Sequence, residues 1–485
     1  MNMRFYIALW ISKIYSAISR VILKRGSSAP GAIALRLYPL ILKELSGRVR
    51  GKTIVVCGTN GKTTTNNLLY AILKAKGMKV VCNNAGANML NGIITAYING
   101  CGAFGKIDAD YVCIEVDEAT ATKAFDSIRP DYMVITNFFR DQLDRYGEID
   151  LTVDWLKKAV GKAPEAVLIL NGDDPICGGF YREAENKRIF FGIDERMPTA
   201  AALRETKEGR YCAFCRHELK YNFYIYSQLG DYYCESCGFG RPLLDISASG
   251  IKVGNSIEFT VSGSALAGGE PMRDGKGKGQ GAGSFSESAS GVQSAPSGVE
   301  NSYDIRTDLM GVHNIYNIMA AMAVVSLLGT DMGNINEILS AYKPQSGRME
   351  EFAIRGMPVI LNLSKNPAGF NQAISDMLRD PRDKDVVIVI NDNAPDGTDV
   401  SWLWDVDFEE LGAGCFSRFA ISGIRAEDMF LRMKYAGIAE DSVLFEKDIK
   451  SAIDAMLAGK NEVLYVLVNY SPLVEARKVL LKLGK

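Results

Sequence analysis

Histidine is almost absent from this chain, which has two, His217 and His313, among 485 residues. Charge of one sign is not in excess either, because the formal net charge is −2. A nearly neutral chain is not held on nucleic acid by bulk charge, so we expect no nucleic-acid partner. The sequence also has no apolar run of roughly 18 or more residues, so it predicts no helix that crosses a bilayer.

The scarcity of histidine also limits the catalytic chemistry. A glutaminase usually needs a cysteine nucleophile with a nearby histidine base. His217 lies among paired cysteines and His313 lies at the start of an expected helix, and neither has an evident cysteine partner. We therefore do not expect this chain to release ammonia from glutamine by itself.

Six of the ten cysteines are scattered, several of them in apolar, strand-like runs. This pattern is typical of reduced, buried thiols in a cytosolic protein. The length corresponds to two or three domains of ordinary size, and the composition, 47% hydrophobic and 23% charged, is that of a globular protein.

The N-terminal segment, residues 1–45, is basic and has no acidic residue before Glu44. Its apolar residues recur at near-helical spacing, and Lys13 interrupts the continuous apolar centre that a signal peptide needs. Two interpretations stay open. The segment is either an amphipathic helix packed on the rest of the protein or a helix that lies on an anionic membrane surface.

A glycine-rich loop follows the apolar run "KTIVVC", which predicts a buried strand over 52–57. A helix is expected to begin at about Lys62, so the order strand, loop, helix is that of a phosphate-binding loop. The usual first glycine is missing, because position 56 is Val56. Backbone N–H groups and the helix N-terminus would hold phosphate oxygens, Lys62 would neutralise their charge, and the hydroxyl of Thr63 would bind Mg²⁺. The predicted nucleotide-binding residues here are Gly58, Thr59, Asn60, Gly61, Lys62, Thr63 and Thr64.

Alternating strand and helix patterns predict an α/β fold with a mostly parallel sheet covered on both faces. A central domain is expected over 46–345, and a second strand–helix rhythm from residue 346 predicts a smaller α/β domain over 346–485. Residues 263–300 are rich in Gly, Ser and Ala without apolar periodicity, so we expect a disordered insertion there.

Glu115 ends the expected strand "YVCIEV", beside the phosphate loop. A carboxylate at this edge of a sheet can hold Mg²⁺ directly or through water. Asp117 and Glu118 follow at once and share the possibility, and an exposed strand-end acid without a ligand is the alternative.

Four cysteines form the pattern "CAFC", eighteen residues, "CESC" within a segment expected over 205–245. Thiolates at this spacing suit a tetrahedral Zn²⁺ in a closed, structural site, with the two knuckles joined by a hairpin. Two disulfides are the alternative, and His217 is close enough to compete as a ligand. The predicted zinc ligands are Cys212, Cys215, Cys234 and Cys237.

Several polar residues in the remaining chain are candidates for a site. Asn314 and Asn317 share one face of an expected helix and could read a purine edge, or could only cap that helix. Arg348 could hold a phosphate, and Lys365 lies between a strand and a helix of the second domain. The loop over 391–410 is acidic and aromatic, which favours a site or an interface over a solvated loop. Its acids include Asp392, Asp396 and Asp399.

Taken together, "GTNGKTTT", "GVHNIYNIMAA" and "SGRME" resemble the Mur ligase superfamily, in this order and over nearly the whole chain. The zinc knuckles with "NLSKNPAG" and "NDNAPDGTDVSW" are similar, within it, to the MurT family. This resemblance implies a central ATP-binding domain with an inserted four-cysteine zinc ribbon, followed by a Rossmann-like C-terminal domain.

The resemblance implies an enzyme that uses ATP and Mg²⁺ to convert D-glutamate in the stem peptide of lipid II to D-isoglutamine through an acyl phosphate. It implies that Lys62 holds phosphates, that Thr63 and Glu115 bind Mg²⁺, and that Asn314 and Asn317 face adenine. Arg348 and Lys365 would approach from the closing side.

The sequence departs from the amino-acid-adding Mur ligases at one motif. Asn362 and Lys365 stand where those enzymes carry Asp and His, which suits ammonia as the second substrate. The resemblance implies a heterodimer with a GatD-type glutaminase subunit, whose Cys–His pair Asp399 would complete. An amino-acid-adding ligase of the Mur or folylpolyglutamate type is the alternative. We expect a cytoplasmic protein. If the N-terminal helix lies on an anionic membrane surface, the protein is at the inner face of the cell membrane.

Overall fold

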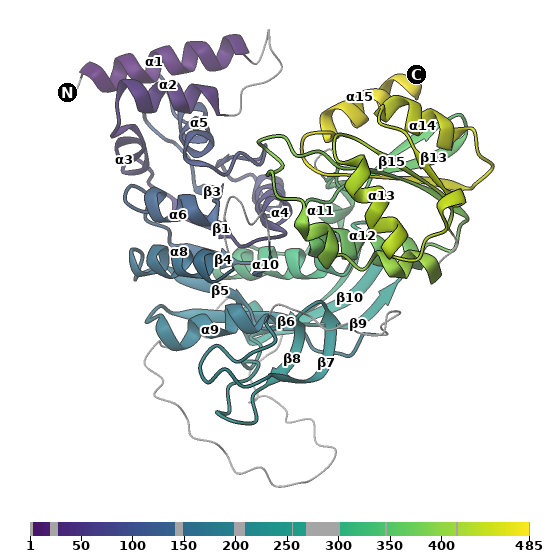
Figure 1. The fold of residues 1–485 in the computed structure, drawn as a ribbon. Helices are drawn as coiled ribbons and strands as arrows, with labels where there is room; N and C mark the ends of the chain where they lie inside the picture. The colour runs from purple at the N-terminus through teal and green to yellow at the C-terminus, as the bar shows by residue number, and fades with distance from the viewer. Residues whose placement is uncertain are drawn as a thin grey trace. The chain divides into compact units, whose positions relative to one another are not determined.

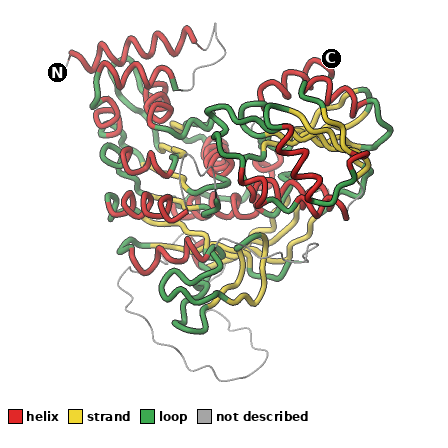
Figure 2. The backbone as a smooth tube through the Cα atoms, in the orientation of Figure 1, coloured by secondary structure: helices red, strands yellow, loops and turns green. Residues whose placement is uncertain are grey.

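The computed structural model describes residues 3–19, 28–140, 149–197, 209–254, 256–267, 301–344, 347–413 and 416–484 (Figure 1). The described chain divides into two compact units. Most of the second unit is the continuous segment from residue 343 to the C-terminus. It also includes residues 139–140 and 149–151, and the sequence did not predict that these belong to it. Each unit has its own sheet between helices (Figure 2).

The first unit begins with three helices ahead of the sheet. They are α1 (Met3–Ile18), α2 (Ala29–Leu37) and α3 (Ile41–Ser46). Among the described helices, none is both long enough and apolar enough to cross a membrane.

The sheet of the first unit has nine strands in the order β11-β10-β9-β6-β5-β4-β1-β3-β2. In this order, the seven strands β9, β6, β5, β4, β1, β3 and β2 pair in parallel with their neighbours. β10 and β11 add an antiparallel edge next to β9. The predicted parallel α/β fold is therefore confirmed for this unit. Its strands are β1 (Lys52–Cys57), β2 (Val80–Cys82), β3 (Tyr111–Glu115), β4 (Tyr132–Ile135), β5 (Val167–Asn171), β6 (Arg188–Ile193), β9 (Ile246–Val253), β10 (Ile257–Gly263) and β11 (Asn301–Thr307).

Helices between these strands bury the sheet. The helix that carries the two predicted asparagines, α10 (His313–Leu327), is buried along almost its whole length, as its nearly unbroken apolar sequence requires. The other helices are α4 (Lys62–Ala75), α5 (Leu90–Gly100), α6 (Glu118–Ala124), α8 (Ile149–Gly161), α9 (Pro175–Glu183) and α11 (Ile335–Ala341).

The first five residues of the predicted disordered insertion, 263–267, are structured. Gly263 still belongs to β10, and residues 264–267 form a 3-10 turn in which Ala265 and Leu266 are buried. Burial of these two apolar side chains is the physical reason why the prediction is wrong for residues 263–267. The rest of the insertion, 268–300, lies outside the described residues.

A hairpin of β7 (Lys220–Tyr226) and β8 (Leu229–Tyr233) lies between β6 and β9 in the chain. Asp173, which follows β5, links the segment after the hairpin to α10. Its carboxylate accepts from Nε of Arg241, after β8, at 2.7 Å and from the hydroxyl of Tyr316, in α10, at 2.6 Å. The hairpin is the one that the zinc prediction requires.

The second unit has a six-stranded sheet in the order β12-β13-β17-β14-β15-β16, parallel except for the β12–β13 pair. Separate apolar clusters cover its two faces, which agrees with the predicted second α/β domain. Its strands are β12 (Glu350–Ile354), β13 (Met357–Leu363), β14 (Lys384–Val389), β15 (Phe416–Ser422), β16 (Val443–Phe445) and β17 (Val463–Val468). Its helices are α12 (Pro367–Arg379), α13 (Ala426–Tyr435), α14 (Ile449–Leu457) and α15 (Leu473–Leu483), with 3-10 turns at η3 (Ser401–Asp405), η4 (Phe408–Ala413) and η5 (Glu440–Ser442).

Candidate functional site

The glycine-rich loop joins β1 to α4 as predicted. Its conformation explains why position 56, the usual first glycine of a phosphate-binding loop, can be a valine. Val56 is fully buried inside β1, so the chain turns only at Gly58, which has a φ of +112°. A Cβ on Gly58 would lie 2.3 Å from Thr136 Oγ1, and one on Gly61, with a φ of +85°, would lie 2.2 Å from Asn317 Oδ1. Only glycine fits these two left-handed, crowded positions.

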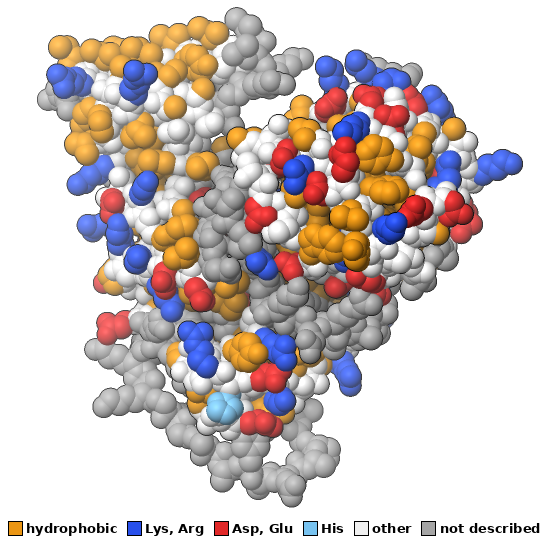
Figure 3. All heavy atoms as spheres, in the orientation of Figure 1, with side chains coloured by type: hydrophobic (Ala, Val, Ile, Leu, Met, Phe, Trp, Pro, Cys, Tyr) orange, Lys and Arg blue, Asp and Glu red, His pale blue; other side chains and the backbone are white. Residues whose placement is uncertain are grey.

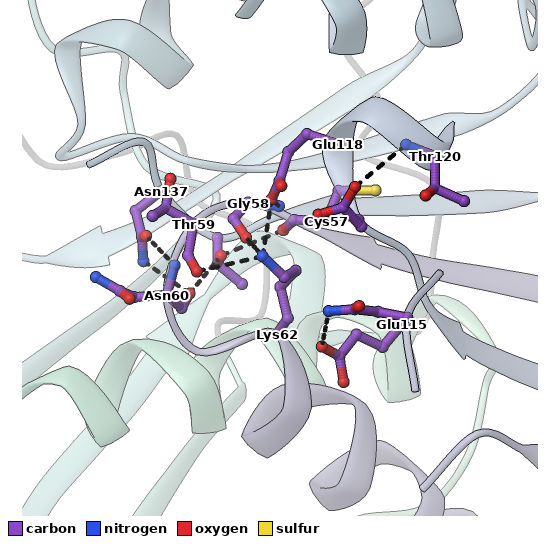
Figure 4. A network of polar contacts seen from close by, with 12 residues as sticks. Cys57, Gly58, Thr59, Asn60, Lys62, Glu115, Glu118, Thr120 and Asn137 are labelled. Carbon is purple, nitrogen blue, oxygen red and sulfur yellow. Dashed lines mark hydrogen bonds and ion pairs between the residues drawn. The ribbon is translucent and has the colours of Figure 1, made fainter. Parts of the chain in front are cut away.

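The loop is held in shape by residues that follow β4. The backbone N–H of Thr59 donates to the carbonyl of Asn137 at 2.8 Å, and that of Asn60 donates to Asn137 Oδ1 at 2.9 Å (Figure 4). The hydroxyl of Thr136 donates back to the carbonyl of Asn60 at 2.7 Å. The loop therefore has a fixed conformation, and α4 begins behind it with Thr63 and Thr64 half-buried in its first turn. The first N–H groups of a helix have no partner within the helix, so this end is suited to an anion.

Lys62, the first residue of α4, points back over the loop (Figure 4). Its Nζ donates to the carbonyls of Gly58 and Thr59 and lies 2.9 Å from Glu118 Oε1. Glu118 Oε1 also accepts the backbone N–H of Gly58 at 3.1 Å. The Glu118 carboxylate thus binds both the lysine and a loop N–H. These two donors are of the kind that bind an anionic ligand.

Electrostatics keep Lys62 charged although it is buried. Burial by itself lowers its pKa, but the carboxylates of Glu118, Asp117 and Glu115 outweigh burial, so the pKa is raised above its ordinary value. Burial raises the pKa of Glu118, against the lowering effect of Lys62. The lysine is therefore a permanent cation at this site.

Glu115 lies at the end of β3, beside the first turn of α4. Its Oε2 accepts from the Thr63 hydroxyl at 2.7 Å, and its Oε1 accepts from Asn88 Nδ2 at 2.8 Å. The side chain is 2% exposed, so the alternative of an exposed strand-end acid does not hold for it. A hydroxyl and a carboxylate oxygen at this distance are hard donors of the kind that Mg²⁺ prefers, so the pair fits a magnesium ion.

The sheet order explains why these residues meet. β1 lies between β3 and β4, so the loop, the residues after β3 and the residues after β4 all leave the same carboxyl edge. At this point the strand order reverses, which is where parallel α/β sheets bind ligands.

Asn317 lies against the loop from α10. Its Nδ2 donates to Asn314 Oδ1 at 2.9 Å, and its Oδ1 accepts from the Thr65 hydroxyl at 3.2 Å. Asn314 Nδ2 donates in turn to the carbonyl of Met310. The structure thus places the predicted pair beside the phosphate loop, with both amides in one hydrogen-bonded chain, and their contact with adenine stays a prediction.

The remaining candidates belong to the second unit. Arg348 is exposed in a turn, and β13 bonds the residues before and after it. Leu363 N donates to Gly347 O at 2.7 Å, and Met349 N donates to Asn362 Oδ1 at 3.3 Å. Lys365 is half-buried just before α12. The structure therefore brings the "SGRME" turn and the "NLSKNP" segment together within this unit.

The three acids of the 391–410 loop have different surroundings. Asp396 is buried and accepts from Ser471 N at 2.7 Å, which is a structural contact. Asp392 lies 3.7 Å from Arg425 Nη1. Asp399 is half-exposed ahead of η3, and the backbone N–H of Ser401 donates to it at 2.8 Å and lowers its pKa.

The four paired cysteines converge as predicted. Their Sγ atoms lie within 4.8 Å of one another, with 3.5 Å between Cys212 and Cys237 and 3.4 Å between Cys215 and Cys234. Zn–S bonds of about 2.3 Å at tetrahedral angles place sulfurs about 3.8 Å apart, so the cluster fits zinc, whereas a disulfide needs about 2.05 Å. All four thiols are free, and His217 is not a member of the cluster.

The two knuckles have the same backbone. Arg216 N donates to Cys212 O and Gly238 N to Cys234 O, each at 3.0 Å, and both donors have a positive φ. An apolar cluster packs beneath the sulfurs, which include the buried Cys212 and Cys234. The site is closed on its inner side, as expected for a structural metal.

Sequence reasoning missed part of the site. Glu118 was named only as a neighbour of Glu115. Asn88, Asn137 and Asn83, whose Oδ1 accepts from Glu115 N at 2.8 Å, were not named as supports. A usable signal was present, because polar residues follow β2, β3 and β4 at the edge where parallel strands end.

Comparison with known proteins gives two family matches. The model of the Mur ligase middle domain matches residues 56–232, and the model of the MurT ligase C-terminal region matches residues 363–473. The first contains the loop, Glu115 and the first cysteine pair, Cys212 and Cys215, and it ends just before Cys234. The second contains Lys365 and Asp399.

Among curated relatives, the chain is similar to the lipid II isoglutaminyl synthase (glutamine-hydrolyzing) subunit MurT of Staphylococcus aureus, with 32% identity over 93% of this chain and 92% of the relative. The subunit of the same name from Streptococcus pneumoniae is 32% identical over 94% and 93%. Among solved structures, a type C pseudomurein peptide ligase from Methanothermus fervidus has a TM-score of 0.65 and 21% identity, covering 90% of this chain and 80% of its own. MurF from Thermotoga maritima in complex with ADP has a TM-score of 0.60 and 15% identity, covering 93% and 84%. The two structures establish the fold.

Proposed function

The chain belongs to the MurT family of Mur ligases, and from this membership we propose that it is the synthetase subunit of a lipid II isoglutaminyl synthase. The observation that carries the proposal is the match over 93% of the chain to a subunit of that name. The proposed reaction is the ATP-dependent amidation of the α-carboxyl of D-glutamate in the stem peptide of lipid II, which gives D-isoglutamine.

A carboxylate is a poor electrophile, so it is activated first. Its oxygen attacks the γ-phosphorus of ATP, the bond to the β-phosphate oxygen breaks, and ADP leaves. Ammonia then attacks the acyl carbon, the bond to phosphate breaks, inorganic phosphate leaves, and the nitrogen loses one proton. Catalysis of this kind rests on positioning and on neutralising phosphoryl charge.

The site residues divide into two roles in this proposal. The loop from Gly58 to Gly61 and the first turn of α4 hold the phosphates, with Lys62 as the cation. Mg²⁺ neutralises phosphoryl charge when bound, and Thr63 and Glu115 are the residues that would hold it. We assign the adenine side to Asn314 and Asn317, and nucleotide-binding cations to Arg348 and Lys365.

Ammonia comes from a separate subunit in this proposal. The sequence has two histidines, one beside the cysteine cluster and one at the start of α10, and it shows no evident Cys–His pair for glutamine hydrolysis. A glutaminase of the GatD type would supply the ammonia, and Asp399 would complete its Cys–His pair. Asp396 is buried and Asp392 lies against Arg425, whereas Asp399 is half-exposed and accepts from the backbone of its own loop, which supports this choice.

The cysteine cluster would hold one structural Zn²⁺, which supports the hairpin and takes no part in the reaction. Because lipid II is membrane-bound through its lipid, the protein would work in the cytoplasm at the inner face of the cell membrane.

The test uses the full-length protein with its glutaminase partner, lipid II, ATP, Mg²⁺ and glutamine. We expect one ADP for each amide formed, and a product in which one hydroxyl is replaced by an amino group, measured by mass spectrometry. With ammonium in place of glutamine, the isolated chain should give the same product. Incorporation of an amino acid instead would favour the alternative ligase and overturn the proposal.

A further inference from the structure

We propose that an apolar stripe on the outward face of α1 docks the protein on an anionic phospholipid surface. The stripe consists of six side chains of α1 that are each 43% to 75% exposed. Five of them recur every three or four residues and the sixth, Ile11, lies next to Trp10, so all six share one face of the helix, over about 22 Å at 1.5 Å per residue. They are Met3, Ile7, Trp10, Ile11, Ile14 and Ile18.

The opposite face of α1 is the one that packs on the protein, and it is less apolar than the stripe. Ala8, Ser12 and Ser16 are buried there, together with Phe5 and Leu9. Ser16 Oγ donates to Asn99 Oδ1 at 2.8 Å. A helix that only packs on its own domain would turn its isoleucines inward, so this orientation indicates that something else covers the stripe.

A neighbouring loop extends the apolar surface. Trp10 Nε1 donates to the carbonyl of Ala103 at 2.7 Å, which ties the indole to this loop. The next residue, Phe104, is 70% exposed, and its carbonyl accepts from Arg48 Nη1 at 3.0 Å. Orange side chains accordingly run along the edge of the molecule over α1, with blue side chains beside them (Figure 3).

The charge around the stripe identifies the kind of partner. Residues 1–43 contain seven Lys or Arg and no Asp or Glu. Three of these cations lie outside the described residues and count here by charge alone. Among the others, Arg4 lies beside the stripe, and Arg36 and Lys43 are exposed on α2 and α3. Each cation near an anionic leaflet contributes about 1 kcal/mol to binding.

This charge excludes a second copy of the chain as the occupant, because two such segments would bring cations against cations. An apolar stripe with tryptophan, flanked by tyrosines and cations, is instead typical of a helix that lies in the plane of a bilayer interface. Tyr6 and Tyr15 are the half-buried flanking residues. A lipid-linked substrate also favours a membrane as the partner, so this inference rests in part on the proposed function. It names the surface through which the protein reaches that substrate.

The experiment measures binding of the full-length protein to vesicles, without substrate, ATP or partner. Vesicles contain either phosphatidylcholine alone or phosphatidylcholine with phosphatidylglycerol. We expect sedimentation with the anionic vesicles, weakened by salt, and a blue shift of tryptophan fluorescence that Trp10→Phe removes. The variant Ile7→Ser/Ile14→Ser should bind roughly 10-fold more weakly or worse, since two apolar side chains leave the interface.

The control is Val474→Ser/Leu481→Ser, which removes two exposed side chains of α15 at the same spacing and should bind like the natural chain. Charge reversal at Arg4 and Arg36 to Glu tests the contribution of charge without changing the stripe and should remove the preference for anionic vesicles. Equal binding by the α1 and α15 variants, no binding by the natural chain, or a self-association that the α1 variant abolishes would each overturn the proposal. None of these outcomes depends on amidation, which is measured separately with ammonium.

Discussion

The ammonium group of Lys62 lies 2.9 Å from Glu118 Oε1, and the two side chains are only 9% and 6% exposed. A buried ion pair is stable only if hydrogen bonds satisfy both groups. Here the loop carbonyls accept from the lysine and the Gly58 N–H donates to the carboxylate. Glu118 therefore sets the position of the lysine and of the loop at the same time.

Replacement of Glu118 by Ala should impair both stability and catalysis. It leaves the Lys62 cation buried without its partner, which we expect to lower the free energy of unfolding by roughly 3–5 kcal/mol. The displaced lysine should lower kcat for ADP release by at least roughly 100-fold, as for other lost phosphoryl contacts. Chemical unfolding and ammonium-dependent ADP release measure the two effects.

A double variant separates the two roles. Lys62→Met/Glu118→Gln removes both charges, so we expect it to recover much of the stability that Glu118→Ala loses while it stays inactive. Glu118→Gln alone, which can still accept from Gly58, should lie between. Full activity in Glu118→Ala would show that the lysine is positioned by other groups.

Removal of zinc should destabilise the hairpin region without touching the nucleotide loop. We expect about one zinc per chain in freshly purified protein, from a four-cysteine site. Cys215→Ser should lose the metal and lower the thermal midpoint, because metal binding contributes directly to folding. Metal analysis and thermal unfolding check this, with Cys82→Ala, outside the cluster, as the control. A metal-free natural chain would contradict the assignment.

The local parts of the site were predictable from sequence, since each is specified by a few adjacent residues. The strand over 52–57, the helix from Lys62 and the convergence of the two cysteine pairs follow from apolar patterns and spacing. Each of these features is encoded within one short stretch of the chain or within one hairpin.

The supports of the site were not predictable in the same way. Glu118 reaches Lys62 only because β1 inserts between β3 and β4, and strand order is a property of the whole sheet. The orientation of α1 shows the same limit. Its periodicity predicts a helix, but only the packing of Ser12 and Ser16 against the unit reveals that the isoleucines face outward.

Replacement of Asp399 by Asn should separate the two nitrogen sources. If Asp399 serves the partner's glutaminase, glutamine-dependent amidation should fall by at least roughly 100-fold while ammonium-dependent amidation stays unchanged. Asn can still accept from Ser401 N, so the turn before η3 should persist. Product analysis with each nitrogen source gives the ratio.

The matched control for this experiment is Asp392→Asn, an acid in the same loop that faces Arg425. It should leave the ratio of the two activities unchanged. Loss of both activities in the Asp399 variant would assign this residue to the synthetase reaction instead, and survival of both would remove it from the mechanism.

Asp376 should make the protein less stable as the pH rises from about 4 to about 6. Burial raises its pKa to about 6, against the lowering effects of Arg379 and of the hydrogen bond from Gln372 Nε2. An unfolded Asp has a pKa of about 3.9, so in this window the folded state binds more protons and stability falls as they leave. Asp376→Asn stays uncharged, so it should gain on the order of 1–3 kcal/mol at pH 7.5 and almost nothing at pH 4. Thermal midpoints across this range measure the change, with the exposed Glu351→Gln as the control, and a destabilised variant at pH 7.5 would show that the carboxylate is needed in its ionised form.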